Sequence, residues 1–87
     1  MYVYLLQSEK DKTRKYVGIT HNIRLRFTQH NSGSVKATYK LRPWRLIIYT
    51  WIHDSDIALD FERYLKSGSG RAFAKRHFLS SKSVYPT

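Results

Sequence analysis

The order of apolar and polar residues along this 87-residue chain predicts three strands. Each strand segment is rich in aromatic and β-branched residues, which favour an extended backbone. The segments are residues 2–7, 15–20 and 44–53. The third is the most strongly β and is apolar on both faces, which predicts cover on each side. The charged, turn-forming residues 8–14 separate the first two strands so closely that these should form an antiparallel hairpin.

Apolar residues recur at helical spacing in further segments. A short helix over residues 23–30 should begin after Asn22, a favourable N-cap, and stop at residues 31–33, which end in glycine. A second helix should begin at residues 54–56, where two acids suit the N-terminal end of the helix dipole. The glycine-rich residues 67–70 should then break it.

A third helix is predicted over residues 71–79, and residues 34–43, which show no clear period, predict a long loop with room for one helical turn. Together these elements predict an α+β fold, a small three-stranded antiparallel sheet flanked by about three helices. A chain of this length holds one core. Residues 1–80 should therefore form one domain, and residues 81–87 a C-terminal tail.

The net charge of the chain suggests a binding partner in addition to a fold. Sixteen Lys and Arg against six Asp and Glu leave a net charge of +10, spread over the whole chain. Such a field attracts polyanions, and we favour nucleic acid over a merely basic surface that has no particular partner. A membrane is disfavoured because no helix opposes a wide apolar face to a purely basic one.

The composition also bears on how the protein is held together and where in the cell we expect it. The chain has no cysteine, so neither disulfides nor thiolate metal sites hold it together. No apolar run approaches the roughly 20 residues of a membrane span, and no signal peptide is visible before Tyr2. We therefore expect a cytoplasmic protein.

A set of residues suited to phosphodiester chemistry lies between the second strand and the first helix. Tyr16 and Gly18 stand near the end of the strand, where we expect the glycine to let the chain turn and to let backbone approach a ligand. Arg26 and His30 follow on the helix, four residues apart and so on one face. Glu62 lies near the core boundary of the second helix. Taken singly, each residue also has an ordinary structural explanation, as a strand aromatic, a solvated arginine or a histidine at a helix end.

Taken together, these residues resemble the GIY-YIG nuclease domains, of the small single-domain bacterial kind. The residues that carry the resemblance are Tyr2-Val3-Tyr4, Tyr16-Val17-Gly18, Arg26, His30 and Glu62. The match covers nearly the whole chain, from Tyr2 to about Leu79. The chain departs from the pattern at Tyr2, where the first motif has glycine, and a polar residue that some members carry near the C-terminal end has no clear counterpart here.

The resemblance implies that the five side chains Tyr4, Tyr16, Arg26, His30 and Glu62 converge on one catalytic surface and hydrolyse DNA. Glu62 would bind a divalent metal, Mg²⁺ or Mn²⁺, and Arg26 would grip a phosphate oxygen. A tyrosine would orient or deprotonate the attacking water, and the sequence leaves open whether this is Tyr4 or Tyr16. Free tyrosine has a pKa near 10 and histidine one near 6.5, so His30 is either the base itself or a hydrogen-bond partner that holds Tyr4.

The other basic residues are interpreted as contacts to the nucleic-acid backbone. They are Lys36, Lys40, Arg42, Arg45, Arg71, Lys75 and Arg76. Tyr39 and Trp44 lie among the first four, where Trp44 either stacks on bases or belongs to the core. The glycines of residues 66–76 could offer amides to a phosphate, but the P-loop residues are missing, which argues against a nucleotide cofactor.

Two functions of other classes stay open at this point. One is a nucleic-acid-binding module whose nuclease site is weak or unused, favoured by the lack of a second DNA-binding domain. The other is a basic interaction protein without a nucleic-acid partner. The sequence identifies no protein partner and no oligomeric state.

Overall fold

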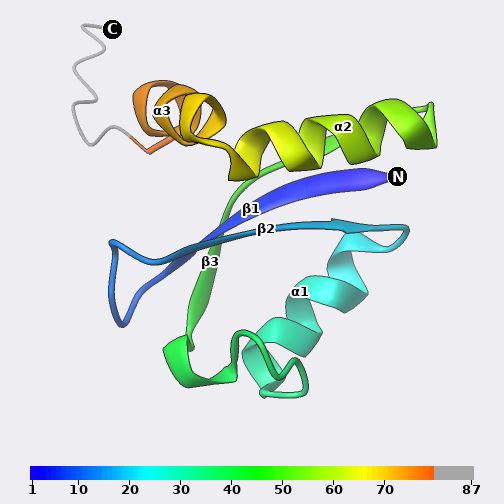
Figure 1. Cartoon of the computed structure of the whole chain (residues 1–87). Helices are drawn as coiled ribbons and strands as arrows, with labels where there is room; N and C mark the ends of the chain where they lie inside the picture. Colours follow the sequence, from blue (N-terminus) through cyan, green and yellow to red (C-terminus); the bar gives the residue numbers. More distant parts are fainter. Residues whose placement is uncertain (80–87) are drawn as a thin grey trace, which may run out of the picture.

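A three-stranded antiparallel sheet with helices on both faces forms the molecule (Figure 1). The computed structural model describes residues 1–79, and the expected tail at 81–87 lies outside them. The strands are β1 (Tyr2–Ser8), β2 (Lys15–Thr20) and β3 (Trp44–Trp51), and the helices are α1 (Ile23–Ser32), α2 (Ser55–Lys66) and α3 (Gly68–His77). A 3₁₀ turn, η1 (Tyr39–Leu41), provides the single turn expected in the long loop. The predicted α+β class is confirmed.

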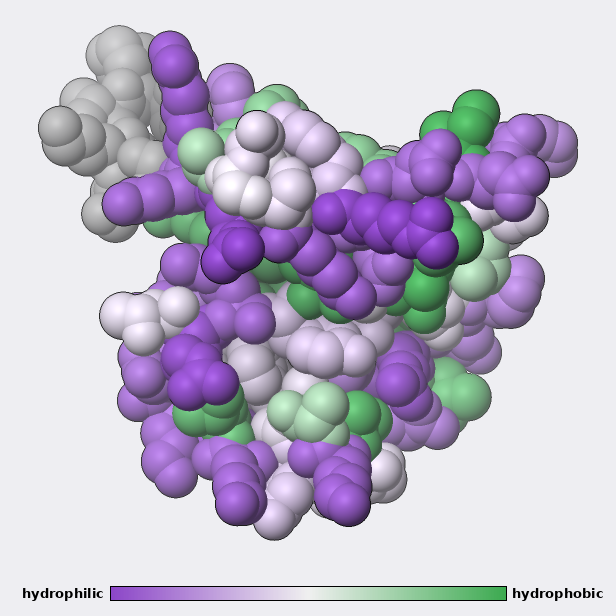
Figure 2. Space-filling view, in the orientation of Figure 1, coloured by the Kyte–Doolittle hydropathy of each residue, from purple (hydrophilic) through white to green (hydrophobic). Residues whose placement is uncertain are grey.

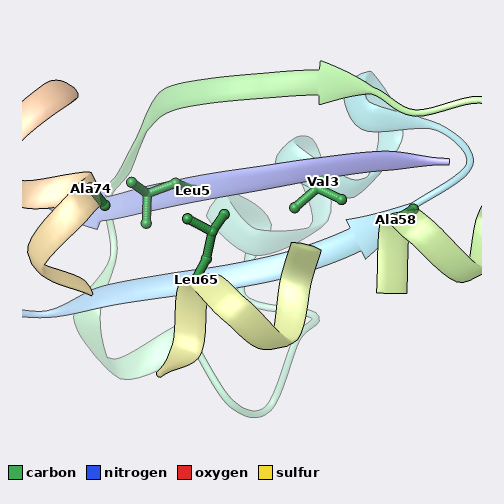
Figure 3. Close-up of a cluster of buried hydrophobic side chains, with 5 residues drawn as sticks. All are labelled: Val3, Leu5, Ala58, Leu65 and Ala74. Carbon is green, nitrogen blue, oxygen red and sulfur yellow. The ribbon is translucent and has the colours of Figure 1, made fainter. Parts of the chain in front are cut away.

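β1 lies at the centre of the sheet, in the order β2-β1-β3, because it pairs with β2 on one side and with β3 on the other. Because side chains alternate along a strand, β1 supplies a core on each face. Val3 and Leu5 pack against α2 and α3 together with Ala58, Leu65 and Ala74 (Figure 3). On the face that α1 covers, Tyr4 and Leu6 pack with Trp44, and Ile23 and Phe27 of α1 complete this core as its apolar stripe predicts.

The expectation that the third strand is covered on both faces is wrong. β3 is an edge strand, and its Tyr49 and Trp51 side chains are each 54% exposed. Its apolar character arises partly from an aromatic cluster at this edge, where the ring of Tyr2 lies 5.0 Å from that of Trp51 and 6.0 Å from that of Tyr49. Cover on both faces belongs instead to β1, whose residues 3–6 are all buried.

Trp44 belongs to the core, so its possible role in base stacking is excluded. Its side chain is 4% exposed, and its indole Nε1–H donates a hydrogen bond of 2.8 Å to the carbonyl of Thr38. The Asn31 side chain accepts from the Trp44 amide at 2.6 Å and donates to the Trp44 carbonyl at 3.0 Å. These bonds attach the last turn of α1 and the loop after it to the start of β3.

Helix ends follow the predicted caps, with one difference at α3. Asn22 caps α1 by accepting from the Leu25 amide, and Asp54 caps α2. Ser67 alone separates α2 from α3. It is the C-cap of α2, and its hydroxyl oxygen accepts from the Gly70 amide as the N-cap of α3.

Residues 67–70 were therefore wrongly predicted as a longer break, and α3 begins at Gly68 and ends at His77 rather than covering 71–79. Gly70 lies inside α3, where a Cβ would overlap the Tyr64 carbonyl of α2. The absence of a side chain therefore permits the close crossing of α2 and α3. Within residues 1–79, none of the helices combines the length and apolarity that crossing a membrane requires.

Candidate active site

Gly18 makes room for the Tyr4 side chain. The two residues are partners in the β1–β2 register, Gly18 is buried, and a Cβ on it would overlap the phenol ring of Tyr4. The ring therefore lies across β2, toward the free edge of the sheet. We expected the chain to turn at Gly18, but it does not, because β2 continues to Thr20. The need for glycine here is steric rather than conformational.

A buried hydrogen-bond chain begins at the Tyr4 hydroxyl. His30 of α1 lies 2.8 Å away through Nε2, and its Nδ1 lies 2.8 Å from the Thr38 hydroxyl. All three residues are at most 1% exposed. Buried polar groups are costly unless paired, and within residues 1–79 every buried side-chain nitrogen and oxygen has a partner. Pairing of this kind fixes the orientation of the Tyr4 ring.

His30 is neutral at physiological pH. Burial, and next the nearby positive charge of Arg26, lower the pKa of His30 to about 4. A neutral imidazole has one donor nitrogen and one acceptor. The Thr38 hydroxyl donates to the Val35 carbonyl at 3.4 Å, which leaves its oxygen to accept from Nδ1–H. Nε2 is then the acceptor, and the Tyr4 O–H donates to it.

The pKa of Tyr4 responds to the other candidate side chains. Burial raises the pKa of Tyr4 above its ordinary value of 10.0, a hydrogen bond from Arg26 opposes that rise, and the charges of Tyr16 and Glu62 reinforce it. Arg26 therefore lies near the Tyr4 oxygen, although its guanidinium donates to Gln29, and the charge of Glu62 acts on Tyr4 from α2.

Tyr16 completes an aromatic group with Tyr4 and His30. Its ring centre lies 4.9 Å from that of His30 and 6.3 Å from that of Tyr4. Unlike Tyr4, it is only half-buried. The structure therefore brings four of the five predicted residues together around Tyr4, from β1, β2 and α1. The fifth, Glu62, comes from α2, which covers the other face of the sheet, and only its charge is seen to act on Tyr4.

Glu62 provides a carboxylate that could bind a metal. Its side chain is 13% exposed and lies 3.0 Å from the ammonium group of Lys66, one helical turn later. No group of three or more His, Cys, Asp or Glu residues gathers in the part of the chain that the structure describes. A hard cation such as Mg²⁺ suits such a site, since it can bind through one carboxylate and fill its other positions with water and phosphate oxygens.

The seven predicted nucleic-acid contacts are all exposed, but they lie in separate places. Lys40 and Arg42 join Lys10 around an open depression that also contains Tyr39. Arg71 and Lys75 line a groove beside α3, whereas Lys36, Arg45 and Arg76 line neither hollow. Figure 2 shows hydrophilic residues around much of the visible face. The predicted contacts therefore lie in separate places and do not form one strip.

Sequence reasoning missed Thr38 and Lys66. Thr38 lies in the loop at residues 34–43, where the spacing of residues gives no indication of a contact with His30. Only a three-dimensional structure reveals this contact. Lys66 could have been found, because a lysine four residues after Glu62 lies beside it on a helix.

The buried His30 should make stability depend on pH. As the pH falls from about 6.5 toward 4, the unfolded chain binds a proton that the folded chain resists, so the free energy of unfolding should fall. A pKa lowered from 6.5 to about 4 corresponds to a loss on the order of 3 kcal/mol. Urea unfolding across this pH range measures it.

His30→Gln is the matched control, because glutamine can accept a hydrogen bond from Tyr4 but does not titrate. We expect the variant to be less stable at neutral pH and to show a much flatter pH dependence. Parallel curves for the two proteins would show that His30 does not cause the loss.

Comparison with known proteins agrees with this geometry. The family model of the GIY-YIG catalytic domain matches residues 1–77. No curated protein and no solved structure matches the chain significantly. GIY-YIG domains are endonuclease domains that act on DNA and generally depend on divalent metals. With nearly the whole described fold inside the match, the chain belongs to the GIY-YIG family of nuclease domains.

Proposed function

We propose that this protein is a metal-dependent endonuclease that hydrolyses DNA phosphodiester bonds at the site around Tyr4. The observation that carries the proposal is the buried Tyr4–His30 hydrogen bond, with the positive charge of Arg26 nearby. A phenol, a neutral imidazole and a guanidinium held together beside a carboxylate supply a proton acceptor, a phosphate ligand and a metal ligand. Family membership supports the same chemistry.

Arg26 binds a non-bridging oxygen of the scissile phosphate. Its planar, permanently charged fork suits two phosphate oxygens, and it gains interaction energy as charge builds on the phosphate in the transition state. In the free protein one guanidinium nitrogen donates to the Gln29 side chain at 3.2 Å, which orients the group along α1. The residue is half-buried, so a bound phosphate would be partly shielded from water.

Tyr4 takes a proton from the attacking water while passing its own proton to His30. The water O–H bond breaks as a new O–H bond forms on Tyr4, and the original phenol proton moves to Nε2 of His30. Free phenolate is then not required, which matters because burial raises the pKa of Tyr4. Phosphate binding would favour the transfer, since it offsets the Arg26 charge that helps to lower the pKa of His30.

Tyr16 orients the substrate rather than accepting the proton. Its half-buried ring lies next to His30 and leaves one side accessible, whereas Tyr4 is the residue whose hydroxyl reaches His30. Separate Tyr4→Phe and Tyr16→Phe variants distinguish these roles.

Glu62 would hold a divalent cation, Mg²⁺ or Mn²⁺, through its carboxylate, and such an ion would supply stabilisation of the negative charge that develops during hydrolysis. Lys66 would then have to give up its contact with Glu62. The exposed basic residues hold the rest of the DNA backbone, which should make binding weaken as salt rises.

Incubation of purified protein with supercoiled plasmid and with branched DNA tests the proposal. We expect cleavage with Mg²⁺ or Mn²⁺ and none with a chelator. If no substrate is cut with either metal, the proposed activity is wrong.

The ion pair of Glu62 favours a second function, a DNA-binding module without hydrolysis. The ammonium of Lys66 already balances the carboxylate at 3.0 Å, so a metal must compete for it. Under this alternative, the protein binds DNA with strong salt dependence, and Glu62→Gln binds as tightly as the wild type.

A further inference from the structure

A groove of about 590 Å³ lies between the β1–β2 hairpin and α3, next to the proposed active site. Its apolar lining includes the half-buried Val17 and Leu79, together with the buried Leu5 and Leu65 of the core. In Figure 2 an indentation opens on the left, between the part formed by α3 and the part formed by the hairpin. The volume falls within the range of about 300 to 1,000 Å³ that small-molecule sites occupy.

The rim of the groove is positive. Lys15 lies on the hairpin side, Lys66 at the end of α2, and Arg71 and Lys75 on α3. All four are exposed, and no aspartate or glutamate of the described residues lines the groove. An apolar lining beneath four cations complements a ligand that has a flat apolar part and several negative charges.

The groove and the candidate site share one residue directly and meet at a second. Tyr16 lines the groove and also contacts His30, and Lys66 lines it and also pairs with Glu62. A strand that places one phosphate at Arg26 would then reach the groove by passing Tyr16 at the β2 edge of the sheet.

We propose that this groove binds unpaired nucleotides of the DNA strand next to the scissile phosphate. The inference rests on the proposed nuclease function and specifies its substrate, DNA with a single-stranded segment beside the cut. Phosphates would bind to the cationic rim, and bases would lie on the apolar lining. A base within a duplex is stacked on both faces, so only an unpaired base can make this contact.

Ala72 provides a precise test, because it lines the groove and is itself exposed on α3. Ala72→Glu introduces a negative charge there, and Ala72→Gln is a control of the same size. The binding of a fluorescent single strand and of the corresponding duplex is measured by anisotropy with a chelator present, so that no cleavage occurs. We expect Ala72→Glu to bind the single strand at least about tenfold more weakly than Ala72→Gln, with less than about threefold change for the duplex.

A second pair of variants does not depend on Ala72. Arg71→Gln with Lys75→Gln removes two rim charges, and Arg24→Gln with Arg63→Gln removes two exposed charges that do not line the groove. If each rim cation holds one phosphate, the first pair should lower the salt slope of single-strand binding by about 1.4, at about 0.7 per phosphate. The second pair should leave that slope closer to the wild-type value.

Equal single-strand affinity for Ala72→Glu and Ala72→Gln would overturn the proposal. So would equal losses for single strand and duplex, which would assign the rim to the duplex backbone. These binding results are independent of cleavage. If the groove variants lose single-strand binding but the wild type cuts nothing, the binding site stands and the nuclease function fails.

Discussion

Glu62→Gln should lower DNA cleavage by at least about 10³-fold while DNA binding persists or improves. Glutamine keeps the size of the side chain but removes the charge that attracts a cation. A loss of this size corresponds to about 4 kcal/mol of transition-state stabilisation, within what a bound metal supplies. Binding should persist because the substitution removes a negative charge from a protein that attracts DNA through its positive field. Single-turnover cleavage and anisotropy measure the two effects.

Asp60→Asn is the matched control for Glu62→Gln. Asp60 lies on the same helix, is exposed, and loses the same charge when substituted. We expect it to cleave at nearly the wild-type rate. If both variants lose activity equally, the effect comes from the overall field and not from a metal at Glu62.

Arg26→Ala should lower cleavage by about 10² to 10³-fold and change DNA affinity by less than about threefold. The phosphate contact at Arg26 is one among many in binding, but it strengthens as the transition state forms. Arg26→Lys should recover only part of the rate, because lysine restores the charge without the planar fork.

Arg24→Ala controls for the loss of charge from α1, since Arg24 is exposed on the same helix. It should cleave normally. An equal loss of cleavage in Arg24→Ala and Arg26→Ala would show that Arg26 contributes only general attraction for DNA.

Local rules account for the features that the sequence predicted. The short segment between the first two strands permits only a hairpin. Asn22 and Asp54 cap their helices because their side chains reach amides two or three residues away. Arg26 and His30 lie on one side of α1 because helical spacing requires it. The motif resemblance then identified Tyr4 and Glu62, which spacing alone could not connect.

Features that depend on tertiary packing could not be read in this way. The order of the strands in the sheet decides which strand is central, and this order is not visible in the sequence. The apolar sequence of β3 therefore suggested a buried strand, although β1 is the strand with a neighbour on each side. Trp44 lies among basic residues in sequence, yet its indole reaches Thr38 and enters the core. Gly70 looked like a helix breaker, but its role depends on the Tyr64 carbonyl of the neighbouring helix.

The same limit applies to the site itself. Sequence reasoning left His30 as either a base or a partner of Tyr4, because its pKa depends on burial that only the fold provides. The 2.8 Å contact with Tyr4 and the pKa of about 4 support the role of a neutral partner that accepts the phenol proton.

The central claim is that water attacks the phosphate at this site, and cleavage in ¹⁸O-labelled water tests it most directly. Wild-type protein with Mg²⁺ or Mn²⁺ should give products whose new 5′-phosphate carries one ¹⁸O atom, because the attacking water supplies that oxygen and the 3′ oxygen leaves. Glu62→Gln in the same reaction should give no labelled product. Cleavage without ¹⁸O in the phosphate, or labelled product at an undiminished rate from Glu62→Gln, would contradict the account.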